Sequence, residues 1–453
     1  MQLESTQYTT TKALFMSSAV WFVFGALLGL TAATRMAAPD LLPNVAWLVF
    51  SRLRPMHTNT MIFGFVGSAL IGAAFYMVPT LLRTTLFSEK MGRWTVLVWN
   101  VTIVAGNVTL ALGYSQGREY AEWIWPVDFM VLVAFGLMIY NMIQTAYRRN
   151  EKIFYVSTWY VFAGLVFTSL IYFFGNAMWE PSGAIIGIPD AILAWFYGHG
   201  VVGLFLTPLA VAIAYYVVPN VSRSPLYSHT LSLVGFWTIL MIYTHIGTHH
   251  LLQTPVPTWL KVLSISGSLA MLIPVMTVLL NLWLTMRGRL SYFHSDIGGK
   301  FIVAGLLWYI LTCIQGPLQA LPVVQRITHL NNWVVAHAHM GVLGFSGTIG
   351  LGAIYFMLPR ITGRPIYSSR LADVQYWLVL LGMTGFFLVL TAVGLIQGNS
   401  WLNGETVYRT LPMLHPYFVV RAATGILLLG SSLIGLVNIT MSIYGPRRAE
   451  AEP

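Results

Sequence analysis

Six histidines that fall within apolar segments are the residues of this sequence best suited to bind metals. They are His57, His199, the pair His249 and His250, and His337 and His339 of an Ala-His-Ala-His stretch. A polar side chain inside hydrocarbon is costly without a partner, so an imidazole there indicates a functional role. For any one of them, a hydrogen bond to a neighbouring helix is an equally good explanation. The arrangement of all six together favours the functional role.

The six histidines are expected at one depth in the membrane. His57 begins an apolar segment, and His199, His337 and His339 lie five to seven residues into segments entered from the same side. His249 and His250 close a segment that runs in the opposite direction. At about 1.5 Å of rise per residue, all six reach the outer third of the membrane. Scattered structural histidines would not align in this way.

The spacing of these histidines suits three metal ions. In His-x-His on a helix the two side chains point about 200° apart, so they serve two cofactors on opposite sides of the helix. His337 and His339 therefore suggest two haems, and His57 can complete the coordination of the His339 iron. That iron would only carry electrons, whereas the iron held by His337 alone keeps an open face. Across that face, the remaining three imidazoles of His199, His249 and His250 form a ligand set that suits copper.

Membrane helices must position these ligands. Stretches of about 20 residues with few or no charges are long enough to cross a hydrocarbon core of about 30 Å. In lipid they must be helical, because the backbone has no water to satisfy its polar groups. Twelve such stretches occur, near 14–34, 54–78, 94–114, 126–146, 158–178, 192–218, 230–252, 264–286, 301–324, 332–357, 372–396 and 413–444.

The composition excludes a water-soluble protein and a disulfide-rich one. Of the 453 residues 57% are hydrophobic and 8% are charged, whereas a soluble domain carries about 25% charged residues. The single cysteine, Cys313, excludes a disulfide framework, a zinc ribbon and a haem attached through Cys-x-x-Cys-His. Loops are short and no internal repeat is evident, so residues 1–453 are expected to form one membrane domain.

The distribution of the positive charges, which give a net charge of +10, indicates how the chain is oriented in the membrane. With twelve spans, sixteen Lys and Arg residues fall on the side that holds both termini and seven on the other. Both termini are therefore expected in the cytoplasm. Nucleic-acid binding is not needed to explain the charge.

These residues resemble the haem–copper oxidase superfamily, and within it the cbb3-type cytochrome c oxidase catalytic subunit. The resemblance covers nearly the whole chain. Its markers are Arg-Leu-Arg-Pro-Met-His-Thr-Asn (52–59), Gly-Arg-Glu-Tyr-Ala-Glu with Trp-Pro-Val-Asp (117–128), Trp-Phe-Tyr-Gly-His (195–199), Tyr243 with His249-His250, and Ala-His-Ala-His (336–339).

The resemblance implies a role for each candidate ligand. His57 and His339 would bind a low-spin haem b, His337 a high-spin haem b, and His199, His249 and His250 one copper ion. Arg52 and Arg54 would pair with haem propionates, because guanidinium and carboxylate match in charge and geometry. Interfacial anchoring is the alternative role for the two arginines.

Tyr243 distinguishes between two reactions of the superfamily. It lies seven residues before His250, which on one continuous helix puts both on the same face about two turns apart. In cbb3-type enzymes this tyrosine is linked covalently to the first copper ligand, here His199, and supplies a proton and an electron when dioxygen is cleaved. The nitric oxide reductase branch instead uses iron and a glutamate four residues after that histidine, where this chain has Gly203. Dioxygen reduction is predicted, and nitric oxide reduction is the alternative.

Protons must reach this outer site from the cytoplasm. Tyr215, Ser232 and Asn281 lie below Tyr243 and coincide with positions of the single proton path of cbb3-type enzymes. Each of the three could equally be structural.

The expected protein is an all-α, twelve-span terminal respiratory oxidase of the bacterial cytoplasmic membrane, coupled to proton uptake and pumping. Since the chain lacks Cys-x-x-Cys-His, c-type-haem-bearing, membrane-anchored subunits are expected to deliver electrons from cytochrome c. Two other classes explain less. An electron carrier leaves His199, His249 and His250 without purpose, and a transporter would use discontinuous helices with polar residues at the midplane.

Overall fold

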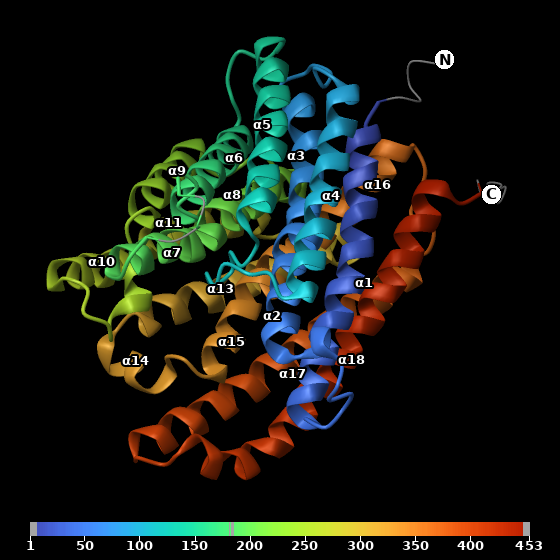
Figure 1. The fold of residues 1–453 in the computed structure, drawn as a ribbon. Helices are drawn as coiled ribbons and strands as arrows, with labels where there is room; N and C mark the ends of the chain where they lie inside the picture. Colours follow the sequence, from blue (N-terminus) through green and yellow to red (C-terminus); the bar gives the residue numbers. More distant parts are fainter. Residues whose placement is uncertain (1–6, 181, 183–184, 447–453) are drawn as a thin grey trace.

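The computed structural model describes residues 7–180, 182 and 185–446, and every regular element in these ranges is helical (Figure 1). Arg447 and Arg448, two of the charges counted above, lie outside the described residues. The first turn of α1 (Thr9–Ala37) and the last turn of α18 (Val407–Tyr444) lie at the same end of the molecule (Figure 1), as an even number of spans requires.

Three composite helices form the interior. The first runs from α2 (Phe50–Asn59) through the π-helical η2 (Thr60–Gly67) into α3 (Ser68–Leu81). The second joins α7 (Ile188–Gly200), η3 (Val201–Leu206) and α8 (Thr207–Ser222), and the third joins α15 (Asn332–His339), η5 (Met340–Gly347) and α16 (Thr348–Thr362). Their apolar cores are 89 to 100% buried, against 39 to 61% for the other long spans. The others therefore face lipid.

The outer spans surround these three. They are α1 (Thr9–Ala37), α4 (Glu89–Leu112), α5 (Trp125–Tyr147), α6 (Val156–Gly175), α9 (His229–Tyr243), α10 (Thr258–Ala270) with α11 (Leu272–Met286), α13 (Ile297–Gln319), α17 (Ser369–Leu402) and α18 (Val407–Tyr444). Short helices complete the chain, namely η1 (Ala46–Leu48), η4 (Gly247–Leu251), α12 (Leu290–Ser295) and α14 (Pro322–Thr328).

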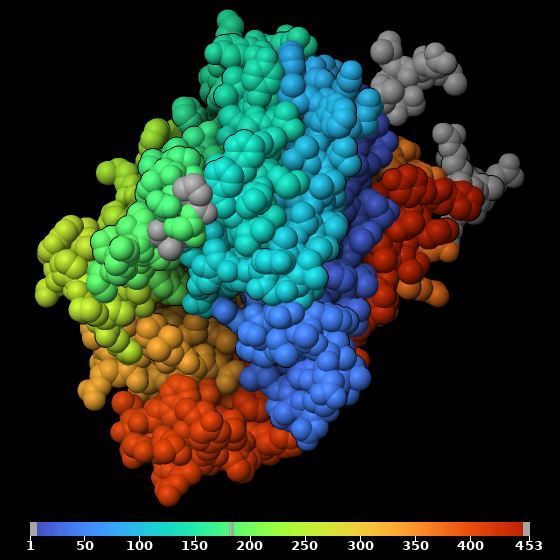
Figure 2. All heavy atoms as spheres, in the orientation of Figure 1, coloured from blue at the N-terminus to red at the C-terminus, as the bar shows by residue number. Residues whose placement is uncertain are grey.

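The twelve predicted spans are present among the described residues. Eleven helices are long and apolar enough to cross a membrane, and α9, with 15 residues, is the shorter twelfth. The chain is thus a multi-pass membrane protein. At the other end of the bundle, the first part of α18 (red-orange) lies beside the connection that follows α1 (blue), as Figure 2 shows. A contact between the His415 ring nitrogen and the Ala37 carbonyl, 2.9 Å long, joins the two.

The expectation that the chain has no internal repeat is wrong. Each composite helix reaches a proline, at 79, 219 and 359, and nine residues later a serine caps the next helix, at 88, 228 and 368. Both sets are spaced by 140 residues. A histidine also precedes or adjoins each π-helical stretch, and such stretches are frequent at functional sites. The repeat escaped notice because it is carried by a few polar residues within uniformly apolar sequence.

One asparagine per repeat fixes the turn that follows the inner helix. Asn141 accepts from the Ser88 backbone N–H at 3.2 Å and donates to the Ser88 carbonyl at 2.9 Å. Asn281 makes the same two hydrogen bonds with Ser228, at 3.0 and 2.7 Å. Asn438 makes them with Ser368, both at 3.0 Å. The three asparagines are buried, so these bonds satisfy side-chain amides that would be costly to leave unpaired.

We expect Asn141→Ala to destabilise the protein by about 1–3 kcal/mol, because it leaves the partly buried Ser88 backbone N–H unpaired and removes one of the two bonds to the Ser88 carbonyl. Thermal unfolding of the detergent-solubilised protein would measure this. Asn399→Ala is the matched control, since Asn399 is exposed and bonds only to its own helix. Equal stability of the two variants would contradict the structural role.

Candidate metal centre

His57 and His339 face one another across a gap that fits one iron ion. Their ring centroids are 6.1 Å apart and their planes are 17° from parallel. Two metal–nitrogen bonds of about 2 Å each, together with the distance from each ring centre to its nitrogen, give roughly this separation. The pair therefore suits the two axial positions of a single haem.

Hydrogen bonds orient both imidazoles of this pair. The Nδ1 atom of His57 lies 2.8 Å from the Gly25 carbonyl of α1, and Nδ1 of His339 lies 2.8 Å from the Val335 carbonyl of its own helix. A carbonyl only accepts, so each Nδ1 carries the proton and each Nε2 keeps its lone pair for a metal.

The second group consists of His199 on α7 with His249 and His250 on η4. One ring nitrogen from each comes within 4.8 Å of the others, close to the spacing of ligands that share a metal at about 2 Å. His199 Nδ1 lies 3.1 Å from His250 Nε2, and Trp195 stacks on the His250 ring with centroids 3.9 Å apart. Three neutral imidazoles suit copper and leave a further coordination position open.

Ser268 on α10 fixes the protonation of His249. Its hydroxyl donates to the Ser264 carbonyl at 2.6 Å, so it accepts from His249 Nδ1, also at 2.6 Å. The His249 Nε2 lone pair is thereby directed into the histidine cluster. As in His57 and His339, Nδ1 donates to an oxygen and Nε2 stays unprotonated, but here the acceptor is a side-chain hydroxyl and not a backbone carbonyl.

His337 is held separately on the third composite helix. Its Nδ1 lies 3.0 Å from Gln315 Oε1 on α13, and Trp333, one turn earlier, stacks parallel to its ring with centroids 5.8 Å apart. The Gln315 oxygen only accepts, so the free lone pair is again on Nε2. No second histidine among the described residues faces it as His57 faces His339, and a single axial ligand suits an iron with an open face.

The helix that carries Tyr243 ends earlier than predicted. A continuous span over 230–252 is wrong, because α9 ends at Tyr243 and the two histidines follow on the 3-10 helix η4. Gly247 accounts for the break: a Cβ there would lie 2.5 Å from the Trp195 carbonyl, so the chain approaches α7 closely only at a glycine. Tyr243 and His250 therefore do not share a helical face.

Tyr243 nevertheless lies at the site. Its ring is 4.4 Å from that of His199, with planes 9° from parallel, and His199 Nε2 is buried without a hydrogen-bond partner. On the other side it packs on Gly203, where a Cβ would lie 1.8 Å from the tyrosine Cζ. The space that a side chain at 203 would need is thus filled by the Tyr243 ring.

The two arginines proposed for haem propionates are engaged by protein groups. Arg52 donates to the Ala111 carbonyl at 2.8 Å, and Arg54 forms an ion pair with Glu119. In the adjoining loop, burial raises the pKa of Glu122, against the opposing influence of the Asn59 amide and Arg54. Burial also raises the pKa of Tyr120 to about 12. The loop that follows α4 is thus bound to α2 by the ion pair between Arg54 and Glu119 and by the hydrogen bond from Asn59 to Glu122.

The predicted proton-path residues are all buried. The Tyr215 hydroxyl lies beside the Asn281 side chain without a hydrogen bond of normal geometry, and Ser232 donates to the His229 carbonyl at 2.6 Å. Asn281 makes the structural bonds described above, so its position is explained by the threefold repeat alone.

Sequence reasoning missed the residues that orient the ligands. Three of them contact a histidine of another helix through their side chains, namely Ser268, Gln315 and Trp195. The fourth, Val335, contacts His339 of its own helix through its backbone carbonyl. Only Gln315, an amide in an apolar span, carried a signal that could have been noticed.

The fold and the paired and clustered histidines define a multi-pass membrane protein with imidazoles arranged to suit metal ions. Residues 9–427 match the family model described as cytochrome c and quinol oxidase polypeptide I. The chain belongs to this family, the haem–copper oxidases.

Known relatives cover the chain almost completely. A cbb3-type cytochrome c oxidase subunit, CcoN1, of Stutzerimonas stutzeri is 32% identical over 98% of this chain and 96% of its own length. A cytochrome c oxidase subunit 1 homolog of Agrobacterium tumefaciens (strain T37) is 32% identical over 96% of this chain and 83% of its own. A nitric oxide reductase subunit of Stutzerimonas stutzeri is less similar, at 27% identity over 94% of this chain and 92% of its own.

The fold is also shared with a solved structure. A haem–copper terminal oxidase dimer determined by cryo-EM aligns with a TM-score of 0.81 over 98% of this chain and 85% of that chain, at 17% identity. At this identity the likeness concerns the fold.

We expect Ser268→Ala to weaken metal binding by the three-histidine cluster about 10- to 100-fold, because His249 loses the acceptor that fixes its tautomer. Copper content after dialysis against a graded chelator would measure this. Ser266→Ala, an exposed serine two residues away, is the control. Copper retention equal to the unaltered protein would show that Ser268 does not orient the ligand.

Proposed function

We propose that this chain is the catalytic subunit of a bacterial terminal oxidase that reduces dioxygen to water in the cytoplasmic membrane. The observation that carries the proposal is the spatial grouping of six histidines into a facing pair, a single residue and a cluster of three. The similarity to cytochrome c oxidase subunits over nearly the whole chain supports it.

The number of histidines at each metal position would decide what that metal can do. When bound, the two b-type haems and the copper ion would carry electrons and bind the gas. His57 and His339 would hold the iron of one haem between them and leave no position for a gas, which would restrict that haem to electron transfer. His337 would hold the second iron alone and leave a position for a gas, and His199, His249 and His250 would hold the copper ion with a further position open.

Tyr243 is the residue we assign to proton and electron donation during cleavage of the O–O bond. It lies against His199, whose Nε2 is free of hydrogen bonds, so a covalent link between these two rings is compatible with their positions. We predict that peptides carrying Tyr243 and His199 remain joined after proteolysis, as mass spectrometry would detect.

Nitric oxide reduction is the second candidate, since a subunit of a nitric oxide reductase is among the relatives. The packing at Gly203 disfavours it. A glutamate at 203 could not coexist with Tyr243 in its present position, because even a Cβ would overlap the tyrosine ring. Without that carboxylate the cluster offers only imidazoles, which suit copper better than non-haem iron. Metal analysis of the purified protein tests this: one copper supports dioxygen reduction, and iron in its place would overturn it.

Protons are proposed to reach Tyr243 from the cytoplasm through the region of Tyr215, Ser232 and Asn281, with some pumped across the membrane. The strongest support is the Tyr215 hydroxyl, which is buried beside the Asn281 side chain and makes no hydrogen bond of normal geometry. Such a group is costly unless water or a function requires it. Waters would have to bridge the intervals between these groups.

Electron delivery is proposed to need partner subunits. The chain has no Cys-x-x-Cys-His for a c-type haem. Membrane-anchored subunits with c-type haems, supplied by cytochrome c, would pass electrons to the haem between His57 and His339. If the isolated chain oxidised soluble cytochrome c at full rate, this part of the proposal would be wrong.

Tyr243→Phe is expected to lower dioxygen reduction by about 100-fold or more, because the phenolic proton is lost while the ring still packs on Gly203. Oxygen consumption, copper content and haem spectra would be measured together. Tyr227→Phe, an exposed tyrosine before the same helix, should leave turnover unchanged. Full activity of the Tyr243 variant with copper retained would remove Tyr243 from the mechanism.

Tyr215→Phe and Tyr355→Phe are expected to have opposite effects. The two residues occupy the same repeat position, four residues before Pro219 and Pro359. Tyr355 is hydrogen-bonded to Gln375 and Asn438, so its variant should lose stability but keep turnover. Tyr215 lies beside Asn281 but makes no hydrogen bond of normal geometry, so its variant should lose less stability than the Tyr355 variant and should lose turnover with slower proton uptake. Unfolding temperatures and proton uptake after a single turnover would show whether this separation occurs.

A further inference from the structure

Tyr160 on α6 carries a buried hydroxyl group that has no hydrogen-bond partner among the described residues. The residue is 1% exposed, and its ring centroid lies 5.9 Å from that of Tyr215 on α8. The Tyr215 hydroxyl is also buried and makes no hydrogen bond of normal geometry, although the Asn281 side chain lies beside it. Two adjacent hydroxyls left in this way are costly, so a further polar group is expected between them.

The threefold repeat shows which partner the second repeat lacks. Tyr355 of the third repeat donates to Gln375, which lies seven residues after the capping serine of that repeat. The Gln375 amide packs on Gly435, where a Cβ would lie 2.1 Å from the amide nitrogen. In the second repeat the position seven residues after the capping serine is Gly235, so no amide is available there.

The neighbours of Gly235 leave no room for a larger side chain. A Cβ at 235 would lie 2.7 Å from Thr277 Oγ1 and 3.4 Å from Val278 Cγ2. The same Cβ would lie 3.5 Å from the Tyr160 hydroxyl, so this hydroxyl is directed at the glycine. A small ligand, rather than a side chain, is therefore expected to satisfy the two tyrosines.

Tyr309 on α13 adds a third hydroxyl to this region. It lies close enough to interact electrostatically with both Tyr160 and Tyr215, and it shares a hydrogen bond with the Cys313 thiol. Cys313 is one turn further outward and interacts electrostatically with Tyr243. Polar groups therefore connect the two unsatisfied hydroxyls with the proposed catalytic tyrosine.

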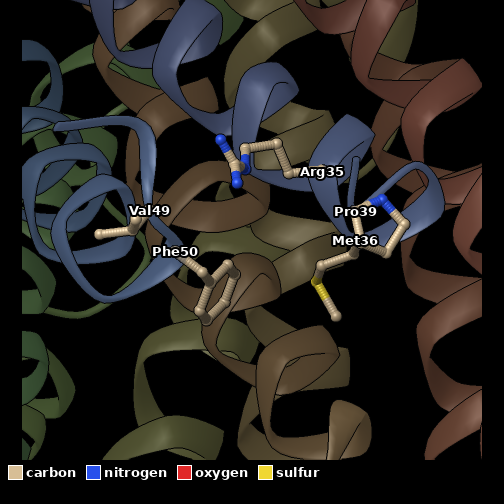
Figure 3. A pocket seen from close by; sticks show the side chains of 5 residues that line it. All are labelled: Arg35, Met36, Pro39, Val49 and Phe50. Carbon is tan, nitrogen blue, oxygen red and sulfur yellow. The ribbon is translucent and has the colours of Figure 1, made fainter. Parts of the chain in front are cut away.

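The two unsatisfied hydroxyls lie towards the end of the bundle that holds the chain termini. Tyr160 is four residues after Val156, the first residue of α6, or about 6 Å along the helix axis. The hollow of about 230 Å³ in Figure 3, which Met36 and Phe50 line with three neighbouring residues, lies at the opposite end of the bundle. Water and protons would thus reach Tyr160 from the inner surface.

We propose that a buried water molecule binds between the Tyr160 and Tyr215 hydroxyls beside Gly235, and that Tyr160 is a positioning residue that holds this water for proton transfer to Tyr243. The role in proton transfer rests on the proposed function. Water fits because it donates and accepts hydrogen bonds, as a hydroxyl does. A buried water makes about three hydrogen bonds, and the two hydroxyls together with the adjacent Asn281 amide supply this number.

A high-resolution density map of the purified multi-subunit enzyme tests the water site directly. An ordered water within hydrogen-bonding distance of both hydroxyls is expected in the unaltered enzyme and not in Tyr160→Phe. A dry contact between the two rings in the unaltered enzyme would overturn the proposal, whichever gas the enzyme reduces. A water that persists in Tyr160→Phe would show that Tyr160 does not hold it.

The unfolding temperature of Tyr160→Phe tests the same site by the sign of its change. Removal of a truly unpaired buried hydroxyl relieves the protein and raises the unfolding temperature, whereas removal of a hydroxyl bound to water loses a hydrogen bond and lowers it. We expect a lower unfolding temperature. An equal or higher one would contradict the water site.

Proton uptake after a single turnover tests the positioning role. Tyr160→Phe should slow uptake about tenfold, the effect of one lost hydrogen bond on a barrier, while haem reduction keeps its rate. Tyr140→Phe is the matched control, because it removes the hydroxyl of a tyrosine that is 49% exposed, and both rates should stay unchanged.

Normal uptake in Tyr160→Phe would remove Tyr160 from the proton path. The map of the unaltered enzyme decides the water site even if this variant does not accumulate. Copper content and carbon monoxide binding of the unaltered enzyme are recorded separately. Their absence would refute the oxidase assignment, whereas the map and the unfolding temperature report on the water site alone.

Discussion

The cost of placing imidazoles inside a membrane is the constraint on which the rest of this structure depends. An unsatisfied polar group in hydrocarbon is strongly unfavourable. His57, His249, His337 and His339 each satisfy one nitrogen with a fixed oxygen, from a carbonyl, a serine or a glutamine. The same bond that makes burial tolerable decides which nitrogen stays unprotonated. Stability and readiness for a metal thus come from one interaction.

The threefold repeat explains how a membrane bundle holds such ligands rigidly. Each inner helix is surrounded by other helices, interrupted by a π-helical stretch beside a histidine, and closed by an asparagine-fixed turn. In the first and third repeats the histidines, His57 and His339, face each other. In the second repeat His199 instead joins the histidines of η4. Departure from symmetry therefore separates the facing pair of histidines from the cluster of three.

Much of this arrangement could be predicted from the sequence because lipid allows few alternatives. Apolar length located the twelve spans, and the rarity of histidine in such spans identified the six candidate ligands. The end of α9 could not be predicted, because it depends on how closely Gly247 approaches Trp195 of another helix. Ser268 was missed for a related reason, since a serine is common in membrane helices and acquires meaning only from its contact with His249 of η4. Contacts between distant segments carry this information, and local pattern does not.

The contact between Gly203 and Tyr243 has a consequence for how such proteins diverge. A carboxylate at the first position and a phenol at the second compete for the same volume, so a change at 203 alone would force the aromatic ring away from His199. The two positions are therefore energetically coupled and their effects should not add. Under the proposed function, a lineage could pass between the two gas chemistries only through a paired replacement or through an intermediate with a disordered site.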